Sequence, residues 1–378
     1  MSVLKKCIVA PDSFKGTLSA IEVSAIMKRT ILEAFPDCEV VTFPVADGGE
    51  GTVDCFLHAS IAEKRMVKTT GPYGESINAY YAKLGTRAVI EVAMVAGLPQ
   101  VEGRQNPRKT TTYGLGEVVK TAITDGCTEI AIGLGGCCTN DGGIGFARSL
   151  GAKFFRKGTG EEFSPDADQM TEIGRIDISA IQSQLKGAHI VAISDVTNPM
   201  YGTNGAAYIF APQKGADQDT VHLLDTNLAA LSTVIKESLH KDVSQVPGAG
   251  AAGALGAGIL AFFGGEIKSG IDTVLDLVGF DAALNGAQLV FTGEGKVDAQ
   301  SFQGKVLSGI LNRTNKYNVP VVVVAGAADA SAETAYELGV SGIFTINRKA
   351  EDLSVSRAFA DSNLEETMHA ILHLYKSK

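Results

Sequence analysis

The chain has 378 residues, of which 45% are hydrophobic and 20% charged, a composition typical of a globular protein with a sizeable core. Its formal net charge of −9 argues against a nucleic-acid-binding protein, because such proteins need a basic surface. An anionic small ligand is not excluded, since local cations and backbone amides can bind one whatever the total charge. The strongly apolar run at residues 252–265 is shorter than the roughly 18–20 residues that span a bilayer. We therefore expect a cytoplasmic protein without membrane or nucleic-acid partners. Its oligomeric state, monomer or homodimer, stays open.

Short apolar, β-branched runs recur along the chain with segments of helix length between them. Such runs are typical of strands that are buried on both faces of a parallel sheet. Their alternation with helices predicts an α/β protein with a Rossmann-like, doubly wound, mostly parallel sheet. The runs lie at residues 7–10, 40–45, 130–134, 190–194, 289–292, 319–325 and 343–346.

Two helices of this sheet have clear start signals. Ser19 and Glu22 form the S-x-x-E pattern of a capping box, and Pro36 marks the end of the helix that follows. Ser362 and Glu365 repeat the pattern before the C-terminal helix. We expect helices to begin directly after Ser19 and Ser362.

Two stretches break the alternation of strands and helices. Residues 64–98 contain strand-like segments joined by turns so short that the strands must pair antiparallel. Residues 198–285 are helical and rich in Gly and Ala, with one extended piece at 205–213. We interpret these stretches as a second α+β domain inserted into the Rossmann-like one. The predicted boundaries are 1–63, 111–196 and 286–378 for the Rossmann-like domain, and 64–110 and 197–285 for the inserted domain.

Polar clusters follow five of the predicted strands. In open α/β sheets the ligand binds beyond the carboxyl ends of the strands, so these clusters predict a site for a charged ligand with a metal. The alternative is that strand-to-helix turns favour Asp, Asn, Ser and Gly for backbone reasons, but this does not account for the lysines. The clusters are Asp12, Ser13 and Lys15; Asp47 and Glu50; the glycine-rich stretch 133–145; Asp195, Thr197 and Asn198; and Glu294, Lys296 and Asp298.

Several familiar motifs fail on their context. The GAGAAG segment at 248–253 follows no buried strand, as a dinucleotide-binding loop would. The GEGK and QGKVL segments lack the spacing of a P-loop, and the histidines lie outside the polar clusters. The six cysteines lack zinc-site spacing, so we expect free thiols, with the adjacent Cys137 and Cys138 as small packing residues. An NAD(P)-dependent oxidoreductase of a small hydroxy acid and a non-catalytic sensor of a small anion stay as alternatives.

Taken together, the ordered motifs of this chain resemble the bacterial glycerate kinase family. The resemblance implies ATP-dependent phosphorylation of D-glycerate with Mg²⁺, with 2-phosphoglycerate favoured as the product, and a cleft between the two domains. The motifs are APDSFKGTLSA (10–20), ADGGEGT (46–52), GLGGCCTNDGGIG (133–145), SDVTNPMYGTNGAAYIFAPQKGA (194–216), PGAGAAGALG (247–256) and FTGEGKVDAQSFQGK (291–305).

Phosphoryl transfer needs amides and cations for the phosphates, oxygen ligands for the metal and a carboxylate that takes the acceptor proton. The glycines after residue 134 let the backbone approach a phosphate, and the helix that follows is expected to offer free N–H groups. For the nucleotide we predict Gly135, Gly136, Thr139, Asn140, Gly142, Gly143 and Lys296.

The remaining roles fall to the other polar clusters. We predict Asp195 as the base, with Asp47 as the second choice, because Asp195 directly follows a buried strand. Lys15 is expected to act in catalysis, contacting either a phosphate or the glycerate carboxylate. The acceptor is predicted to contact Asp12, Ser13, Lys15 and Asn198, and the metal to contact Asp141, Glu294 and Asp298.

Overall fold

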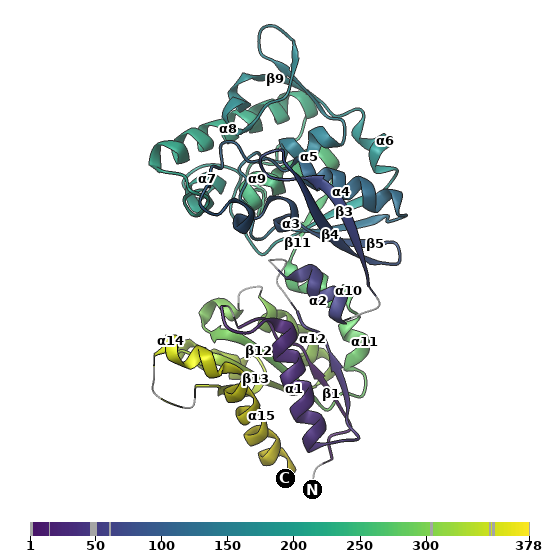
Figure 1. Cartoon of the computed structure of the whole chain (residues 1–378), viewed down its shortest axis with the longest axis vertical. Coiled ribbons are helices and arrows are strands. Elements are labelled where there is room, and N and C mark those ends of the chain that lie inside the picture. The colour runs from purple at the N-terminus through teal and green to yellow at the C-terminus, as the bar shows by residue number, and fades with distance from the viewer. Residues whose placement is uncertain are drawn as a thin grey trace. The chain divides into compact units, whose positions relative to one another are not determined.

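The computed structural model describes residues 3–14, 16–45, 51–59, 62–302, 305–347, 349 and 352–377 (Figure 1). Lys15 and Asp47 lie outside these described residues. The chain forms two compact units, and each is described by itself. Unit 1 comprises Met1–Asp47, Asp54–Ser60 and Gly270–Lys378, and unit 2 comprises Gly48–Val53 and Ile61–Ser269. Most of unit 2 is thus a single insertion into unit 1.

Unit 1 is built on a five-stranded sheet in the order β14-β13-β12-β1-β2, in which every pair is parallel. From β1 the chain moves to β2 on one side, whereas β12, β13 and β14 follow one another on the other side. The topological switch point, where ligands of open α/β sheets bind, therefore lies between β1 and β12. The strands are β1 (Lys6–Val9), β2 (Glu39–Thr42), β12 (Leu289–Val297), β13 (Val321–Ala328) and β14 (Val340–Thr345).

Helices α1 (Ala20–Ala34) and α15 (Ala360–Lys376) lie side by side in unit 1 (Figure 1). Their apolar faces share one core with the strands of the sheet. Met27 of α1, Leu364 of α15 and Phe291 of β12 belong to this core. The other helices of unit 1 are α2 (Thr52–Ala59), α10 (Gly270–Leu277), α11 (Phe280–Leu284), α12 (Val306–Tyr317), α13 (Thr334–Glu337) and α14 (Leu353–Ser356).

Of the two predicted capping boxes, only the first is confirmed. The Ser19 side chain accepts a hydrogen bond from the Glu22 amide, Glu22 reaches back to the Ser19 amide, and α1 ends just before Pro36. The second prediction is wrong, because α15 already begins at Ala360. Ser362 therefore lies inside the helix, where its hydroxyl donates to the carbonyl of Phe359.

Unit 2 is built on a mixed six-stranded sheet in the order β11-β10-β6-β5-β4-β3. Strands β3, β4 and β5 pair antiparallel, as the short turns in residues 64–98 predict, and β5, β6, β10 and β11 pair parallel. The strands are β3 (Glu63–Thr70), β4 (Ser76–Leu84), β5 (Arg87–Glu91), β6 (Glu129–Gly133), β10 (His189–Ile193) and β11 (Glu266–Lys268). A separate antiparallel sheet contains β7 (Lys153–Arg156), β8 (Glu162–Phe163) and β9 (Ile173–Asp177).

The core of unit 2 combines its own strands and helices and includes Ile132, Phe146 and Leu255. No described helix of either unit is long and apolar enough to cross a membrane. The helices of unit 2 are α3 (Ala93–Ala96), α4 (Tyr113–Thr124), α5 (Ile144–Ser149), α6 (Ile181–Leu185), α7 (Ala206–Phe210), α8 (Gln218–Leu239) and α9 (Ala251–Gly258).

The predicted α/β class is confirmed, but the strands are grouped differently from the predicted domains. Residues 111–196 lie in unit 2, because β6 and β10 pair with β5 and β11 and not with a strand of unit 1. Residues 270–285 lie in unit 1, where they form α10 and α11. The extended piece expected at 205–213 is also wrong, since residues 206–210 form α7.

Candidate functional site

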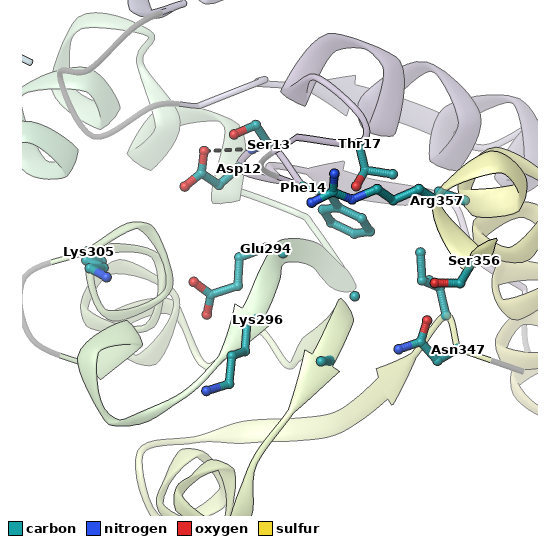
Figure 2. Close-up of a pocket in the computed structure, with 15 residues that line it drawn as sticks. Asp12, Ser13, Phe14, Thr17, Glu294, Lys296, Lys305, Asn347, Ser356 and Arg357 are labelled. Carbon is teal, nitrogen blue, oxygen red and sulfur yellow. Dashed lines mark hydrogen bonds between the residues drawn. The ribbon is translucent and has the colours of Figure 1, made fainter. Parts of the chain in front are cut away.

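A pocket of about 390 Å³ opens at the carboxyl ends of β1, β12, β13 and β14 of unit 1 (Figure 2). It spans the switch point, because Asp12 and Ser13 follow β1 and Glu294 follows the buried run 289–293 of β12. The predicted site residues Asp12, Ser13, Glu294 and Lys296 all line it. The structure thus brings together two of the predicted polar clusters, as expected for the carboxyl ends of adjacent parallel strands.

The two acidic side chains of this pocket are held on neighbouring strands. The amide of Asp12 donates to the Gly293 carbonyl at 2.8 Å, and the Asp12 Oδ1 accepts from the Ser13 amide at 2.6 Å. Burial, with the nearby charges of Asp12 and Asp298, raises the pKa of Glu294 to about 7, although Ser301 and Lys305 act in the opposite direction. A carboxyl group of this kind binds a cation or a proton readily.

Three cationic side chains, Lys296, Lys305 and Arg357, line the same pocket. The Lys296 Nζ lies 3.2 Å from an oxygen of Asp329 and 3.5 Å from one of Asp298, and the hydrogen bond to Asp329 raises the pKa of Lys296. Lys305 occupies the N-cap position of α12, where the helix dipole also favours an anion. The charges therefore suit a ligand that carries several negative groups.

The side of the pocket away from Glu294 and Lys296 combines apolar surface with the guanidinium of Arg357, which Figure 2 shows beside Phe14. Phe14, Ile346 and Ala360 provide apolar surface there, and Figure 2 shows Asn347 and Ser356 on that side, away from Glu294 and Lys296. Apolar surface beside cationic side chains is typical of a site that binds a ring together with charged groups.

Gly293 makes the approach of β12 and β13 at this pocket possible. A Cβ on this residue would lie 2.2 Å from the carbonyl oxygen of Val324, which is closer than any real side chain approaches a backbone atom. The first glycine of the TGEGK segment is therefore needed for the packing of β12 against β13. Its presence there does not require a P-loop.

The predicted residues of unit 2 follow β6 and β10, which pair in parallel. Asp195 lies two residues after the end of β10 at Ile193. Its Oδ1 accepts a hydrogen bond from the Ser269 hydroxyl at 3.0 Å. The Asn198 side chain donates to the Asn204 carbonyl at 2.7 Å, and its own carbonyl accepts from the Gly250 amide. Asn198 thus links two loops of unit 2.

The glycine-rich stretch does not offer the free amides that we expected at the start of α5. The Gly142 amide donates to the Gly253 carbonyl, and those of Gly143 and Gly145 donate to the carboxylate of Asp141. The phosphate role of Gly142 and Gly143 stays a prediction, and it would require these amides to exchange their present acceptors for a phosphate. The sequence could not reveal these hydrogen bonds, since the acceptors come from a buried side chain and from a distant loop.

Asp141 is a buried capping residue in this structure. Its Oδ2 accepts from both the amide and the hydroxyl of Thr112, at 2.8 and 2.9 Å, and from the amide of Gly145. Burial raises its pKa, against the effect of these hydrogen bonds. Both carboxylate oxygens bind protein donors at the starts of α4 and α5, which supports a structural role, while the metal role of Asp141 stays a prediction.

Other predicted residues of the stretch differ among themselves. Thr139 and Asn140 are fully buried, and their side-chain polar atoms have no hydrogen-bond partner within the described residues. Gly135 and Gly136, by contrast, line a second pocket of about 200 Å³ together with Cys137 and Lys214. Lys214 was missed by the sequence reasoning, because nothing in the APQKGA segment signals that a lysine there is buried.

All six cysteines are free and buried, as expected for packing residues. Burial raises the pKa of the Cys138 thiol to about 12, so this sulfur is protonated and unreactive at neutral pH.

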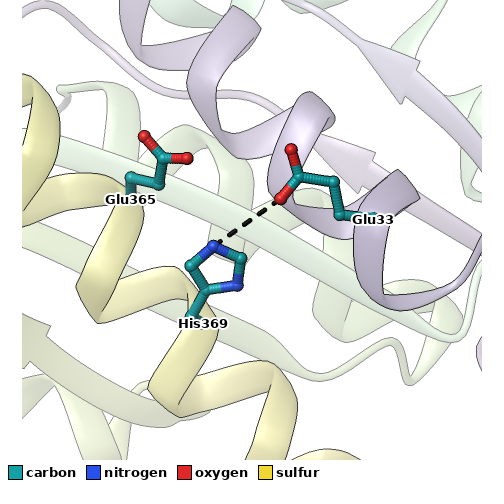
Figure 3. A group of neighbouring side chains, drawn as sticks. All are labelled: Glu33, Glu365 and His369. Atoms are coloured by element: carbon teal, nitrogen blue, oxygen red, sulfur yellow. Dashed lines mark ion pairs between the residues drawn. The ribbon is translucent and has the colours of Figure 1, made fainter.

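A group of Glu33, Glu365 and His369 on α1 and α15 has the side-chain types of a metal site (Figure 3). The His369 Nε2 lies 3.6 Å from an oxygen of Glu33, and Arg29 pairs with Glu365 at 2.7 Å. Because Arg29 also lies 3.9 Å from Glu33, the group is part of an ion-pair network between two packed helices.

Comparison with known proteins gives a single answer over the whole chain. The model of the glycerate kinase family matches residues 7–376. The glycerate 2-kinase of Escherichia coli is 42% identical over 90% of both chains, and the glycerate kinase of Bacillus cereus is 38% identical over 98% of both. The crystal structure of a candidate glycerate kinase 2 from Salmonella typhimurium LT2 superimposes with a TM-score of 0.87 at 37% identity, covering 99% of each chain. With polar side chains gathered at the switch point of a parallel sheet and relatives of this similarity, the chain belongs to the glycerate kinase family.

Proposed function

We propose that this protein transfers a phosphoryl group from ATP to a hydroxyl of D-glycerate, with Mg²⁺, and that 2-phosphoglycerate is the product. Membership of the family carries the reaction type, and the name of the Escherichia coli relative, a glycerate 2-kinase, favours the 2-position. An oxidoreductase is disfavoured, because the GAGAAG segment follows α8 and a loop, and not the strand that a dinucleotide-binding loop requires.

The nucleotide is proposed to bind in the pocket of unit 1. Support comes from its place at the switch point, from Lys296, Lys305 and Arg357 as partners for phosphates, and from the apolar wall that suits a base. Phosphoryl transfer requires that the protein position the reactants and neutralise the charge of the transferring group, and cationic side chains can do both.

The donor set of this pocket fits Mg²⁺. Glu294 has one carboxylate oxygen that is buried and finds no hydrogen-bond partner within the described residues, and Asp12 lines the same pocket. Carboxylate oxygens are the ligands that Mg²⁺ takes from proteins, usually one or two at a time. We assign Glu294 and Asp12 to the metal ahead of Asp298, whose carboxylate pairs with Lys296. Bound there, Mg²⁺ would neutralise phosphate charge.

Asp195 is our proposed general base. It follows the carboxyl end of β10, and the hydrogen bond from the Ser269 hydroxyl orients its carboxylate. Asp47 is the second choice, and Lys15 stays a proposed contact to phosphate or acceptor. Both of these residues lie outside the described part of the chain.

The proposal is tested by ADP release from ATP, Mg²⁺ and D-glycerate, compared with glycolate, lactate and tartronate as acceptors. Enolase added to the product identifies the isomer, because it acts on 2-phosphoglycerate and leaves 3-phosphoglycerate unchanged. We expect ADP release with D-glycerate and immediate consumption of the product by enolase. Absence of ADP with glycerate would refute the function, and a product that needs phosphoglycerate mutase before enolase would refute the 2-position.

A further inference from the structure

The second pocket lies in unit 2 at the carboxyl ends of β6 and β10, and we call it the Lys214 pocket. Gly135 and Gly136 line it from the loop after β6, and Ser194 and Val196 line it from the segment after β10. Asp195 stands between these last two residues in the sequence. A ligand in this pocket would therefore lie beside the backbone that carries the proposed base.

Lys214 is a buried cation in the wall of this pocket. Lys214 is 1% exposed. Its ammonium donates to the Thr139 carbonyl at 2.6 Å and to the Cys137 sulfur at 3.1 Å. Within the part of the chain that the structure describes, these uncharged groups are its hydrogen-bond partners, and it forms no ion pair with an Asp or Glu. An ammonium has three N–H donors, so one donor and the whole positive charge are left for a ligand. Burial of such a charge is costly unless an anion accompanies it.

Two backbone amides add to the donors of the Lys214 pocket. Among the described residues, the amides of Gly135 and Gly136 donate no hydrogen bond, unlike those of Gly142 and Gly143. Gly136 has a φ of +70°, a conformation that favours glycine and turns the chain sharply at this point. Adjacent amides beside an ammonium form a donor set for an oxyanion.

The charge and size of the pocket select among oxyanions. A single ammonium balances one negative charge, which matches a carboxylate better than the several charges of a nucleotide triphosphate. The volume of about 200 Å³ is half that of the pocket in unit 1, which has three cationic side chains. A three-carbon acid fits this space.

We propose that Lys214, with the amides of Gly135 and Gly136, binds the carboxylate of the acceptor acid. The inference rests on the proposed function, since it names the group that recognises the glycerate carboxylate. It assigns a substrate contact to unit 2 that is independent of the nucleotide contacts in unit 1. Recognition of a phosphate at the same donors is the competing outcome, and the experiment separates the two.

The test compares Lys214→Met with Lys241→Met as a matched control. Lys241 is also a partly buried lysine of unit 2 whose ammonium donates to carbonyl groups, those of Leu260 and Ala261, but it does not line the Lys214 pocket. For Lys214→Met we expect the KM for D-glycerate to rise about 10- to 100-fold, the usual effect of a lost charged hydrogen bond, with the KM for ATP within about twofold. Lys241→Met should leave both constants near those of the wild type. A rise confined to the KM for ATP would overturn the proposal in favour of a phosphate contact.

A neutral substrate analogue isolates the contribution of charge. Calorimetric titration should show that the wild-type protein prefers D-glycerate to D-glyceramide, which has an uncharged amide in place of the carboxylate, and that Lys214→Met loses this preference. A variant that keeps the preference would overturn the inference. Binding is measured without turnover, so a failure here can be told from a failure of the proposed reaction, which the ADP assay reports.

A measurement on the wild-type protein covers the case in which Lys214→Met does not fold. Cys137 lines the same pocket, whereas Cys138 does not, so their alkylation by iodoacetamide can be compared by mass spectrometry. D-Glycerate should slow the alkylation of Cys137 at least fivefold or so relative to glycerol, with ATP alone giving no protection. Protection by ATP alone, or none by D-glycerate, would contradict the carboxylate site.

Discussion

Glu294 is a proposed metal ligand whose carboxyl group lies where burial disfavours its ionised form. Its pKa is raised to about 7, so the folded protein holds this proton over a pH range in which the unfolded chain has lost it. The contribution of Glu294 to the free energy of unfolding is thus greatest below the ordinary carboxyl pKa of about 4.5. It falls as the pH rises towards 7 and is constant above that. The total change is no more than about 3 kcal/mol, from the size of the shift.

We therefore predict that Glu294→Gln lowers kcat by about 10²-fold or more while it stabilises the metal-free protein at pH 8. Glutamine keeps the shape but carries no charge, so the cost of burying the carboxylate disappears together with the proposed ligand. Urea unfolding at pH 5 and pH 8, without Mg²⁺, measures the effect, and the stabilisation should be confined to the higher pH. Equal unfolding free energies for the two proteins at pH 8 would contradict the raised pKa.

Asp195 offers a second prediction at the scale of the residue. As a general base, its change to asparagine should lower kcat by about 10²-fold or more, with the melting temperature almost unchanged because the Ser269 hydroxyl can still donate to the amide oxygen. Asp225→Asn is the matched control, since Asp225 is also a partly exposed carboxylate of unit 2 that accepts a hydrogen bond, from the Gly202 amide. Steady-state kinetics that show less than a tenfold loss for Asp195→Asn would move the role to Asp47.

The segment 252–254 is an unusual element of unit 2. Ala252, Gly253 and Ala254 all have φ between +54° and +66°, although alanine rarely adopts this left-handed conformation. Gly253 packs directly on the backbone of Thr139, the residue whose carbonyl accepts from Lys214, and its own carbonyl accepts from the Gly142 amide. The strained turn thus holds the glycine-rich loop in place.

Replacement of Gly253 by alanine tests this role. Its Cβ would lie 2.1 Å from the Thr139 carbonyl oxygen, so we expect a loss of several kcal/mol of stability and of the D-glycerate binding that depends on the loop. Gly264→Ala is the control, because Gly264 has nearly the same φ, +64°, with no atom closer than 3.9 Å. It should lose only about 1–2 kcal/mol, the cost of the conformation itself. Equal losses in chemical denaturation would show that the contact with Thr139 is unimportant.

The sequence predicted which segments form strands better than it predicted which strands pair with one another. All seven apolar runs form strands, because a run of β-branched residues between turn signals is a strong local pattern. The partners of β6 and β10 could not be found in this way, since a parallel strand looks the same in either sheet. The same limit applies to the sites: Asp12 and Glu294 meet because adjacent parallel strands end together, whereas the burial of Lys214 depends on packing between distant loops.

At the scale of the whole molecule, the two units differ in how the chain builds them. Unit 1 is assembled from three segments, and its strands β1 and β12 pair although about 280 residues separate them in the sequence. Unit 2 is almost entirely one continuous segment, with its own core around Phe146 and Leu255 and with both ends of its sheet formed inside it. A continuous segment with a complete core is the usual condition for independent folding.

We accordingly predict that a fragment of residues 61–269 folds alone, with a cooperative thermal transition and dispersed amide resonances. The Lys214 pocket is contained in this fragment, so D-glycerate should raise its melting temperature, and Lys214→Met in the same fragment should remove most of that shift. The converse protein, with residues 61–269 replaced by a short linker, must still close its sheet through a contact distant in sequence and should unfold at a lower temperature. A fragment 61–269 that melts without cooperativity would mean that unit 2 needs unit 1 for its stability, despite its separate core.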